Sequence, residues 1–203
     1  MMKYYIGIDE VGRGSLAGPV TAAAFYLTPE FSDLISSLGL GELRDSKRLT
    51  KKARENWFEY LRRDTSVKYT IASVSPKIID RINIREATNL ASRRAYLKLV
   101  KKIGDKLPDS LKVITDGGLF LGKDIIHRAI IRGDEKFDAI KLASIVAKVH
   151  RDKFMSRKYK SLFLYNFPKH KGYGTKEHRE AIIKHGPSHI HRKSFIKNLW
   201  PLV

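Results

Sequence analysis

The chain has 203 residues, 40 of them Lys or Arg and 21 Asp or Glu, so its formal net charge is +19 at pH 7. Hydrophobic residues make up 42% and Cys is absent, which excludes an intrinsically disordered chain, a disulfide framework and thiolate chemistry. A surface this basic favours a polyanion as partner. We expect no membrane span, because no apolar stretch approaches roughly 20 residues, and a cytoplasmic location, because Asp9 and Glu10 interrupt any signal peptide.

Strands and helices alternate along the predicted chain. Residues 3–9 and 19–27 are rich in Tyr, Ile, Val and Phe and predict two strands joined by a Gly-rich turn, and Thr50 caps a helix to about Arg63. Further predicted elements are a strand at 67–74, a helix from 84 to about 104, strands at 111–115 and 125–131, a helix from 138 to about 160, and a short helix between Thr175 and Gly186. This order predicts an α/β fold.

Positive charge is concentrated towards the C-terminus. Residues 141–203 contain 15 Lys and Arg but only three acidic residues, Asp152, Glu177 and Glu180. This segment is therefore the predicted polyanion-binding face, and a merely solvated Lys-rich surface is the alternative interpretation.

Three acidic residues follow predicted strands: Asp9, Asp116 and Asp134. Functional groups gather beyond the carboxyl ends of strands in an open α/β sheet, so we expect these residues and Glu10 to converge at one edge. Four neighbouring carboxylates need a cation, and oxygen ligands favour Mg²⁺ or Mn²⁺. Beside a basic face, such a site predicts a metal-dependent nuclease. For each acid alone, a strand-end cap or an ion pair with Lys is the alternative.

The turn after the first strand carries two of the glycines. Gly12 and Gly14 fit a loose dinucleotide fingerprint, but 19–27 predicts a strand where that motif needs a helix. Their bare backbone could instead approach a sugar closely and read a 2′-hydroxyl. Neighbouring strand residues face opposite ways, so Asp9 and Glu10 share a site only if the strand ends or bends between them.

Five blocks of the sequence are specific in combination. They are GIDEVGRGSLAGPV at 7–20, DSKRL at 45–49, TDG at 115–117, GD at 133–134 with ASIVAKV at 143–149, and GYGT at 172–175 with GPSHIHRKSF at 186–195. In this order they resemble the type 2 ribonuclease H family, bacterial ribonuclease HII. The resemblance implies a ribonuclease H-like fold: a central mixed β-sheet flanked by helices in a catalytic domain at 1–160, with a helical C-terminal region at 161–203 that packs on it and contributes to substrate binding.

The resemblance also implies roles for particular residues. Asp9, Glu10, Asp116 and Asp134 match the family's ligands for two divalent ions, Mg²⁺ or Mn²⁺. By similarity Asp9 bridges both ions, Asp134 completes the one that activates water, and Glu10 and Asp116 hold the one that stabilises the leaving oxygen. Matching the substrate-binding residues are Gly12, Arg13, Gly14 and Ser15 in the loop that recognises the ribose 2′-hydroxyl, Ser46 and Lys47 at a backbone phosphate, and Tyr173 on the following deoxyribose.

Some positions depart from the family or suggest other chemistry. Ser15, Thr115 and His189 differ from the family's usual residues, and none is one of the four carboxylates. His185, His189 and His191 could suggest zinc, but the Gly-Pro pair at 186–187 breaks the helix that such spacing needs, so we expect these three histidines at the surface or facing phosphate.

The implied activity is that of an endoribonuclease. It would hydrolyse the RNA strand of RNA/DNA hybrids and nick duplex DNA 5′ of embedded ribonucleotides, leaving 5′-phosphate and 3′-hydroxyl ends, in ribonucleotide removal during DNA replication and repair. By the resemblance we expect a monomer, and whether a DNA-clamp partner is bound stays open. The alternatives are a non-catalytic basic nucleic-acid binder, indifferent to Mg²⁺, and a nuclease of this fold with another substrate such as a DNA junction.

Overall fold

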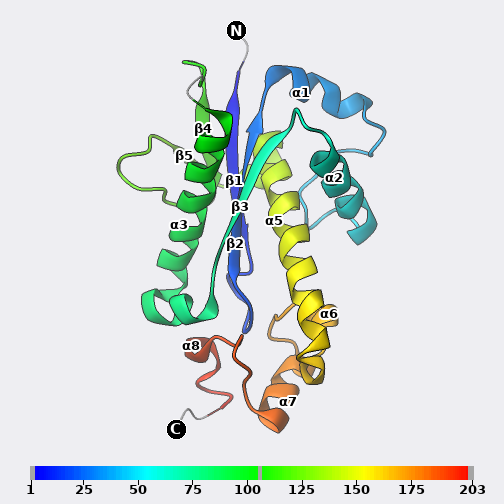
Figure 1. Cartoon of the computed structure of the whole chain (residues 1–203), viewed down its shortest axis with the longest axis vertical. Coiled ribbons are helices and arrows are strands. Elements are labelled where there is room, and N and C mark those ends of the chain that lie inside the picture. The colour runs from blue at the N-terminus through cyan, green and yellow to red at the C-terminus, as the bar shows by residue number, and fades with distance from the viewer. Residues whose placement is uncertain (1–2, 105–106, 201–203) are drawn as a thin grey trace.

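A computed structural model describes residues 3–104 and 107–200, with one five-stranded sheet between two layers of helices (Figure 1). The strands are β1 (Tyr5–Val11), β2 (Val20–Leu27), β3 (Lys68–Val74), β4 (Lys112–Asp116) and β5 (Arg128–Ile130), in the order β3-β2-β1-β4-β5. The pairs β1–β2 and β2–β3 are antiparallel, whereas β1–β4 and β4–β5 are parallel. The sheet is therefore mixed, as expected, and helices flank it on both sides.

Eight α-helices lie in the described part of the chain. They are α1 (Pro29–Leu34), α2 (Lys51–Arg63), α3 (Pro76–Ile103), α4 (Gly133–Lys136), α5 (Asp138–Arg157), α6 (Phe167–His170), α7 (Lys176–His185) and α8 (Lys193–Ile196). Of these, none combines the length and apolar character that crossing a membrane would require.

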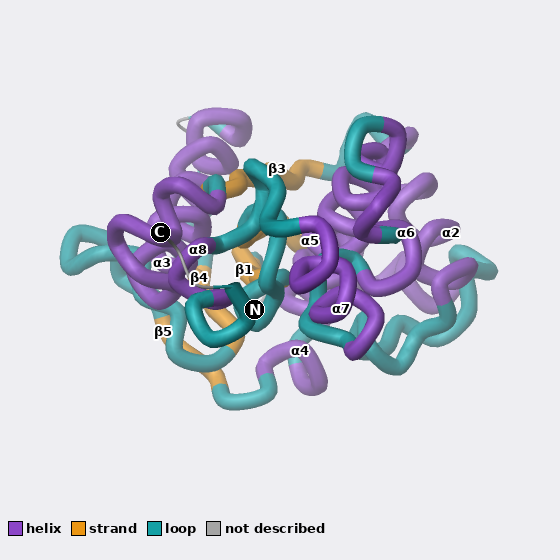
Figure 2. The backbone as a smooth tube through the Cα atoms, turned by 90° about the horizontal axis from the view of Figure 1, so that it is seen from below, coloured by secondary structure: helices purple, strands orange, loops and turns teal. Residues whose placement is uncertain are grey.

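The two faces of the sheet bury separate cores. Ile6 and Ile8 of β1 pack with the α3 face, whereas Tyr5 of β1 and Phe25 of β2 pack with the α5 face. Figure 2 shows the sheet between α3 on one side and α5 and α2 on the other. Successive strand residues point to opposite faces, so alternate residues of β1 serve the two layers. This alternation also decides where the acidic residues at the end of β1 point.

Gly7 allows α5 to lie directly on β1. A Cβ atom at Gly7 would stand 2.2 Å from the carbonyl carbon of Ala139 and 2.5 Å from the nitrogen of Ile140, both backbone atoms that cannot rotate away. We expect Gly7→Ala to reduce the free energy of unfolding by about 3 kcal/mol, because overpacking must separate helix from sheet. Urea denaturation measures this change. Gly118→Ala is the control, since its Cβ would meet nothing within 4 Å; equal midpoints for the two variants would contradict the explanation.

Several boundaries differ from the sequence-based expectations. α3 begins at Pro76 rather than near Ile84, with Asn83 at a non-helical φ of 65° inside it. The strand expected over 125–131 is limited to β5, because Ile126 and Ile131 are 94% and 80% exposed and supply no core contact. α1, α4, α6 and α8 were not predicted, since four to six residues are too few to show a helical period.

The C-terminal helices form a third cluster beside one end of the sheet. Leu16, Met155, Phe167, Ile182 and Ile196 are buried together there, so the cluster joins the loop after β1 to the end of α5 and to α6, α7 and α8. Figure 1 shows these three helices gathered at one end of the molecule. This packing brings the C-terminal sequence blocks to the loop that follows β1.

Candidate active site

The strand pairing places Asp9 and Asp116 at adjacent strand ends. Pairing between β1 and β4 stops at Ile8 and Thr115, so the next residue on each strand is one of these two acids. Asp134 lies on α4, a short helix that begins after β5. Asp9 and Asp134 are each only 5% exposed. Three elements therefore bring three aspartates towards one edge of the sheet.

Asp9 and Glu10 point to opposite faces of β1. The strand neither ends nor breaks between them, since Glu10 and Val11 still pair with β2. The sequence-based expectation that the strand must end or bend between Asp9 and Glu10 is therefore wrong. Asp9 shares the face of Tyr5 and α5, and Glu10 shares the α3 face, by the alternation of the strand. What ends at Ile8 is the pairing with β4, which leaves both acids beside the open end of that strand.

Burial and mutual repulsion raise the pKa values of three of the acids. Desolvation is the largest cause for each, and the pKa of Asp9 stands well above its usual range. The charge of Glu10 raises the pKa of Asp9 further, and that of Asp134 raises the pKa of Asp116. The charge of Asp116 in turn raises the pKa values of both Asp9 and Glu10. Asp116 is thus the electrostatic centre of the group, which favours a bound cation.

Basic side chains of the protein pair with the remaining charge. Lys47 Nζ lies 3.2 Å from Asp134, and Arg13 Nη1 lies 3.4 Å from Glu10. Burial lowers the pKa of Lys47, but the hydrogen bond and charge of Asp134 outweigh it, so that the net change is upward. Within 3–104 and 107–200, no three His, Asp or Glu side chains form a ready-made metal site. The donor set nevertheless suits a hard cation, because it consists of carboxylate oxygens.

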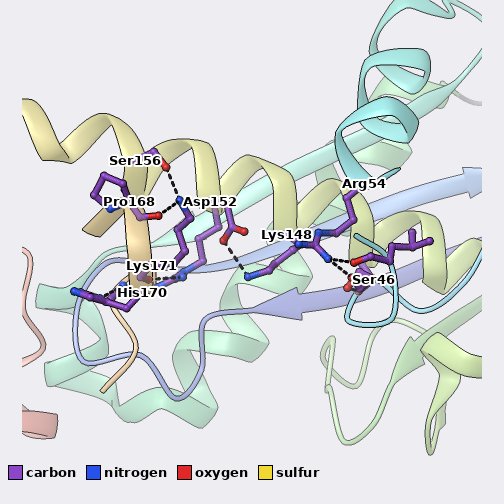
Figure 3. Close-up of polar contacts among 12 residues, drawn as sticks. Ser46, Arg54, Lys148, Asp152, Ser156, Pro168, His170 and Lys171 are labelled. Atoms are coloured by element: carbon purple, nitrogen blue, oxygen red, sulfur yellow. Dashed lines mark hydrogen bonds and ion pairs between the residues drawn. The ribbon is translucent and has the colours of Figure 1, made fainter. Parts of the chain in front are cut away.

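Ser46 is anchored between α5 and α2. Its hydroxyl lies 2.7 Å from that of Ser144 on α5, and Ser144 also hydrogen-bonds Asp9. Arg54 of α2 donates to the carbonyl oxygen of Ser46 at 2.6 Å (Figure 3). It also donates to the carbonyl oxygen of Leu49. Ser144 of α5 therefore contacts both Asp9 of β1 and the loop that carries Lys47.

The loop after β1 requires glycine at its first position. Gly12 has a φ of 89°, and a Cβ atom there would lie 2.2 Å from Nε of Arg151. Ser15 forms an antiparallel bridge with Tyr173, and the N–H of Leu16 donates to Gly172 at 2.8 Å. The Ser15 hydroxyl is buried and finds no hydrogen-bond partner among the described residues. The loop and Tyr173 are thus held side by side.

Tyr173 packs against the basic side of α5. Its ring centre lies 5.8 Å from Nζ of Lys148 and 5.5 Å from the guanidinium of Arg151, within cation–π range. Lys148 also pairs with Asp152 at 3.0 Å, and farther along Lys171 donates to Ser156 and Pro168 (Figure 3). The tyrosine is half-buried, so it is not closed off from a ligand.

The expectation that three histidines face solvent or phosphate is wrong for His191. His185 and His189 are exposed, but His191 is buried and its Nε2 lies 3.0 Å from Nε2 of His178. Ser188 N–H donates to His191 Nδ1 at 2.8 Å, so His191 donates through Nε2 to His178, whose Nδ1 then donates to the Tyr173 carbonyl at 2.9 Å. This chain of hydrogen bonds needs both imidazoles neutral.

Sequence reasoning missed two buried arginines beside the loop. Arg151 donates to the carbonyls of Ala17, Pro19 and Lys171, and Arg192 donates to those of Gly12, Arg13 and Gly18. Both side chains are fully buried. Arg192 lies inside the sequence block at 186–195, and its place in that block is the feature of the sequence that could have identified it.

Comparison with known proteins gives consistent results. A family model described as Ribonuclease HII matches residues 6–200. A Ribonuclease HII of Caldicellulosiruptor saccharolyticus is 43% identical over 197 residues, covering 97% of this chain and 89% of the relative. The crystal structure of the ribonuclease H2 from Pyrococcus horikoshii OT3 gives a TM-score of 0.73 at 22% identity, covering 97% of this chain and 96% of that one. Bst-RNase HIII in complex with Mn²⁺ gives a TM-score of 0.74 at 21% identity, covering 91% and 63%.

The two solved structures establish the fold, and the family model and the bacterial relative establish the family. The mixed five-stranded sheet with helices on both faces agrees with both. The chain therefore belongs to the ribonuclease HII family and is a ribonuclease H, an endonuclease acting on RNA paired with DNA.

Proposed function

We propose that the chain nicks duplex DNA 5′ of embedded ribonucleotides and hydrolyses the RNA strand of RNA/DNA hybrids, leaving 5′-phosphate and 3′-hydroxyl ends. The observation that carries this proposal is the electrostatic coupling of Asp9, Glu10, Asp116 and Asp134 at one sheet edge. These four residues are the proposed catalytic carboxylates. Repulsion among buried carboxylates is tolerated where a cation is bound as part of the function.

The same four residues are the proposed ligands of two Mg²⁺ or Mn²⁺ ions. Such ions, when bound, would activate water and stabilise the leaving oxygen. Asp9 is held in place by Ser144, and Asp116 by the N–H of Gly133 at 2.7 Å. Lys47 shields the charge of Asp134 and, being 79% exposed, can turn towards a backbone phosphate. Ser46 and Lys47 are accordingly proposed as phosphate contacts.

The loop and the tyrosine form the proposed junction-reading surface. Gly12, Arg13, Gly14 and Ser15 would contact the ribose 2′-hydroxyl, and Tyr173 would pack on the next sugar. The bridge between Ser15 and Tyr173 supports this assignment, because it holds the loop and the tyrosine next to each other, where they would contact neighbouring nucleotides of one nucleic-acid strand. A side chain at Gly12 would strike Arg151, which keeps this stretch of backbone bare.

The C-terminal region is proposed as part of the substrate-binding surface rather than a separate function. We divide the chain into a catalytic domain at 1–160 and a helical region at 161–203. Residues 172–173 and 190–192 bond to the loop after β1, so this region would shape the loop as well as supply Tyr173. Its basic side chains suit a phosphate backbone.

A duplex with one embedded ribonucleotide tests the proposed function directly. We expect nicking on the 5′ side of that ribonucleotide with Mg²⁺ or Mn²⁺, none with a chelator, and none of the all-DNA duplex. End-labelled gels resolve the position, and phosphatase treatment identifies the 5′-phosphate. Equal binding of both duplexes without any nicking would instead support a non-catalytic binder. Cleavage that ignores the 2′-hydroxyl would support a nuclease with another substrate.

A further inference from the structure

Arg192 is a buried cation whose hydrogen-bond acceptors are all backbone carbonyls, and its guanidinium lies 5.1 Å from the ring centre of Phe195. It donates to Gly12 at 2.6 Å, Arg13 at 2.7 Å and Gly18 at 3.0 Å, and its side chain is fully buried. No ion pair of Arg192 is found in the described chain, and the nearby Asp80 accepts instead from the N–H groups of the segment that begins α8. Burial, and then the charge of Arg151, lower the pKa of Arg192 to about 9.

Such a cation is costly unless its donors are satisfied. Removing a charged group from water without a counter-ion is unfavourable by several kcal/mol, so the three carbonyls must compensate for much of it. All three belong to the loop after β1. The loop can therefore move only by leaving this guanidinium without its acceptors, which couples the C-terminal block to the shape of the loop.

Because peptide units are planar, the carbonyl contacts with Arg192 also fix the direction of the neighbouring N–H groups. The described chain has no cis peptide bond, so each C=O points opposite to the N–H of the same peptide unit. The carbonyls of Gly12 and Arg13 face Arg192, hence the N–H groups of Arg13 and Gly14 face away from it. Neither N–H has an acceptor among the described residues. A charged partner on each carbonyl also polarises the peptide and strengthens its N–H as a donor.

We propose that Arg192 is a positioning residue for ribonucleotide selectivity: it fixes the N–H groups of Arg13 and Gly14 as donors to the 2′-oxygen of the substrate. The inference deepens the proposed function and rests on it. Arg192 touches no substrate. It acts from behind the loop, through two carbonyls, so its loss should affect recognition of the 2′-hydroxyl more than binding of duplex DNA as such.

The test is the ratio of affinities for a ribonucleotide-containing duplex and the matched all-DNA duplex. Affinities are measured by fluorescence anisotropy with Ca²⁺ in place of the catalytic ion, on the full chain. We expect Arg192→Gln to reduce the ratio at least 10-fold, with all-DNA binding unchanged, and to raise KM in nicking with Mg²⁺ more than it lowers kcat. In Arg192→Lys the ammonium group can reach fewer carbonyls than the guanidinium, so the affinity ratio should lie between those of the wild type and Arg192→Gln.

Arg93→Gln is the matched control for lost stability. Arg93 also donates to a carbonyl, that of Leu121, and pairs with Asp124, but it lies away from the loop. This variant should melt earlier and keep the wild-type ratio. If Arg192→Gln does not fold, Arg192→Lys decides. A folded Arg192 variant with an unchanged ratio overturns the inference alone, whereas a wild-type ratio of one overturns the proposed function itself.

Discussion

Replacing Asp116 by asparagine is expected to slow nicking at a ribonucleotide by at least about 1,000-fold, about 4 kcal/mol in activation free energy. Asparagine keeps an oxygen that can accept from the N–H of Gly133, so the local backbone should hold. It removes the charge that raises the pKa values of Asp9 and Glu10. Single-turnover nicking with Mg²⁺ measures the loss, and duplex affinity measured beside it should be preserved.

Stability provides an independent readout of the same substitution. Burial raises the folded pKa of Asp116, so its ionisation opposes folding: the penalty grows as the pH rises above the unfolded pKa and is complete above the folded pKa. Without divalent ions, Asp116→Asn should therefore raise the free energy of unfolding at pH 7. Asp124→Asn is the control: this exposed acid pairs with Arg93, and its loss should leave nicking intact. Full activity in Asp116→Asn would remove Asp116 from the site.

Acid should destabilise the chain through the buried histidines near Tyr173. Burial lowers the pKa of His178 to about 4 and, joined by the charge of His178, that of His191 to about 3. Because the unfolded pKa is near 6.5, the unfolded state binds more protons below it. The stability contributed by the neutral, buried His178 and His191 is complete above pH 6.5 and is lost as the pH falls towards 4. Each histidine should contribute a loss of about 2 kcal/mol between pH 7 and pH 5.

His191→Gln isolates one of these contributions. The glutamine amide can accept from Ser188 and donate to His178 as the neutral imidazole does, but it does not titrate. The loss of stability between pH 7 and pH 5, from urea denaturation at each pH, should therefore shrink by about 2 kcal/mol in this variant. His185→Gln, at an exposed histidine, should leave the pH dependence unchanged. The same dependence in all three proteins would mean that His191 is charged in the folded chain.

The sequence alone selects the four carboxylates, because strand ends gather polar groups at one edge of the sheet. It also placed α2, α5 and α7 within a few residues, since their caps and apolar spacing are local signals. It misjudged the segment before β5, where apolar residues are exposed, and the strand at Glu10, which continues instead of ending. The metal and substrate roles of the selected residues remain predictions.

What the sequence by itself determined is the family, the mixed sheet between helices and the identity of the candidate acids, all carried by motifs and periodicities within short stretches. Only the tertiary structure decided the partners of charged residues distant in sequence. It placed Arg192 on the carbonyls of Gly12 and Arg13, buried His191 against His178, and set Lys47 on Asp134. The physical reason is that burial and ion pairing depend on which elements pack together, and the residues next to a charged residue in the sequence do not show which distant element it will contact.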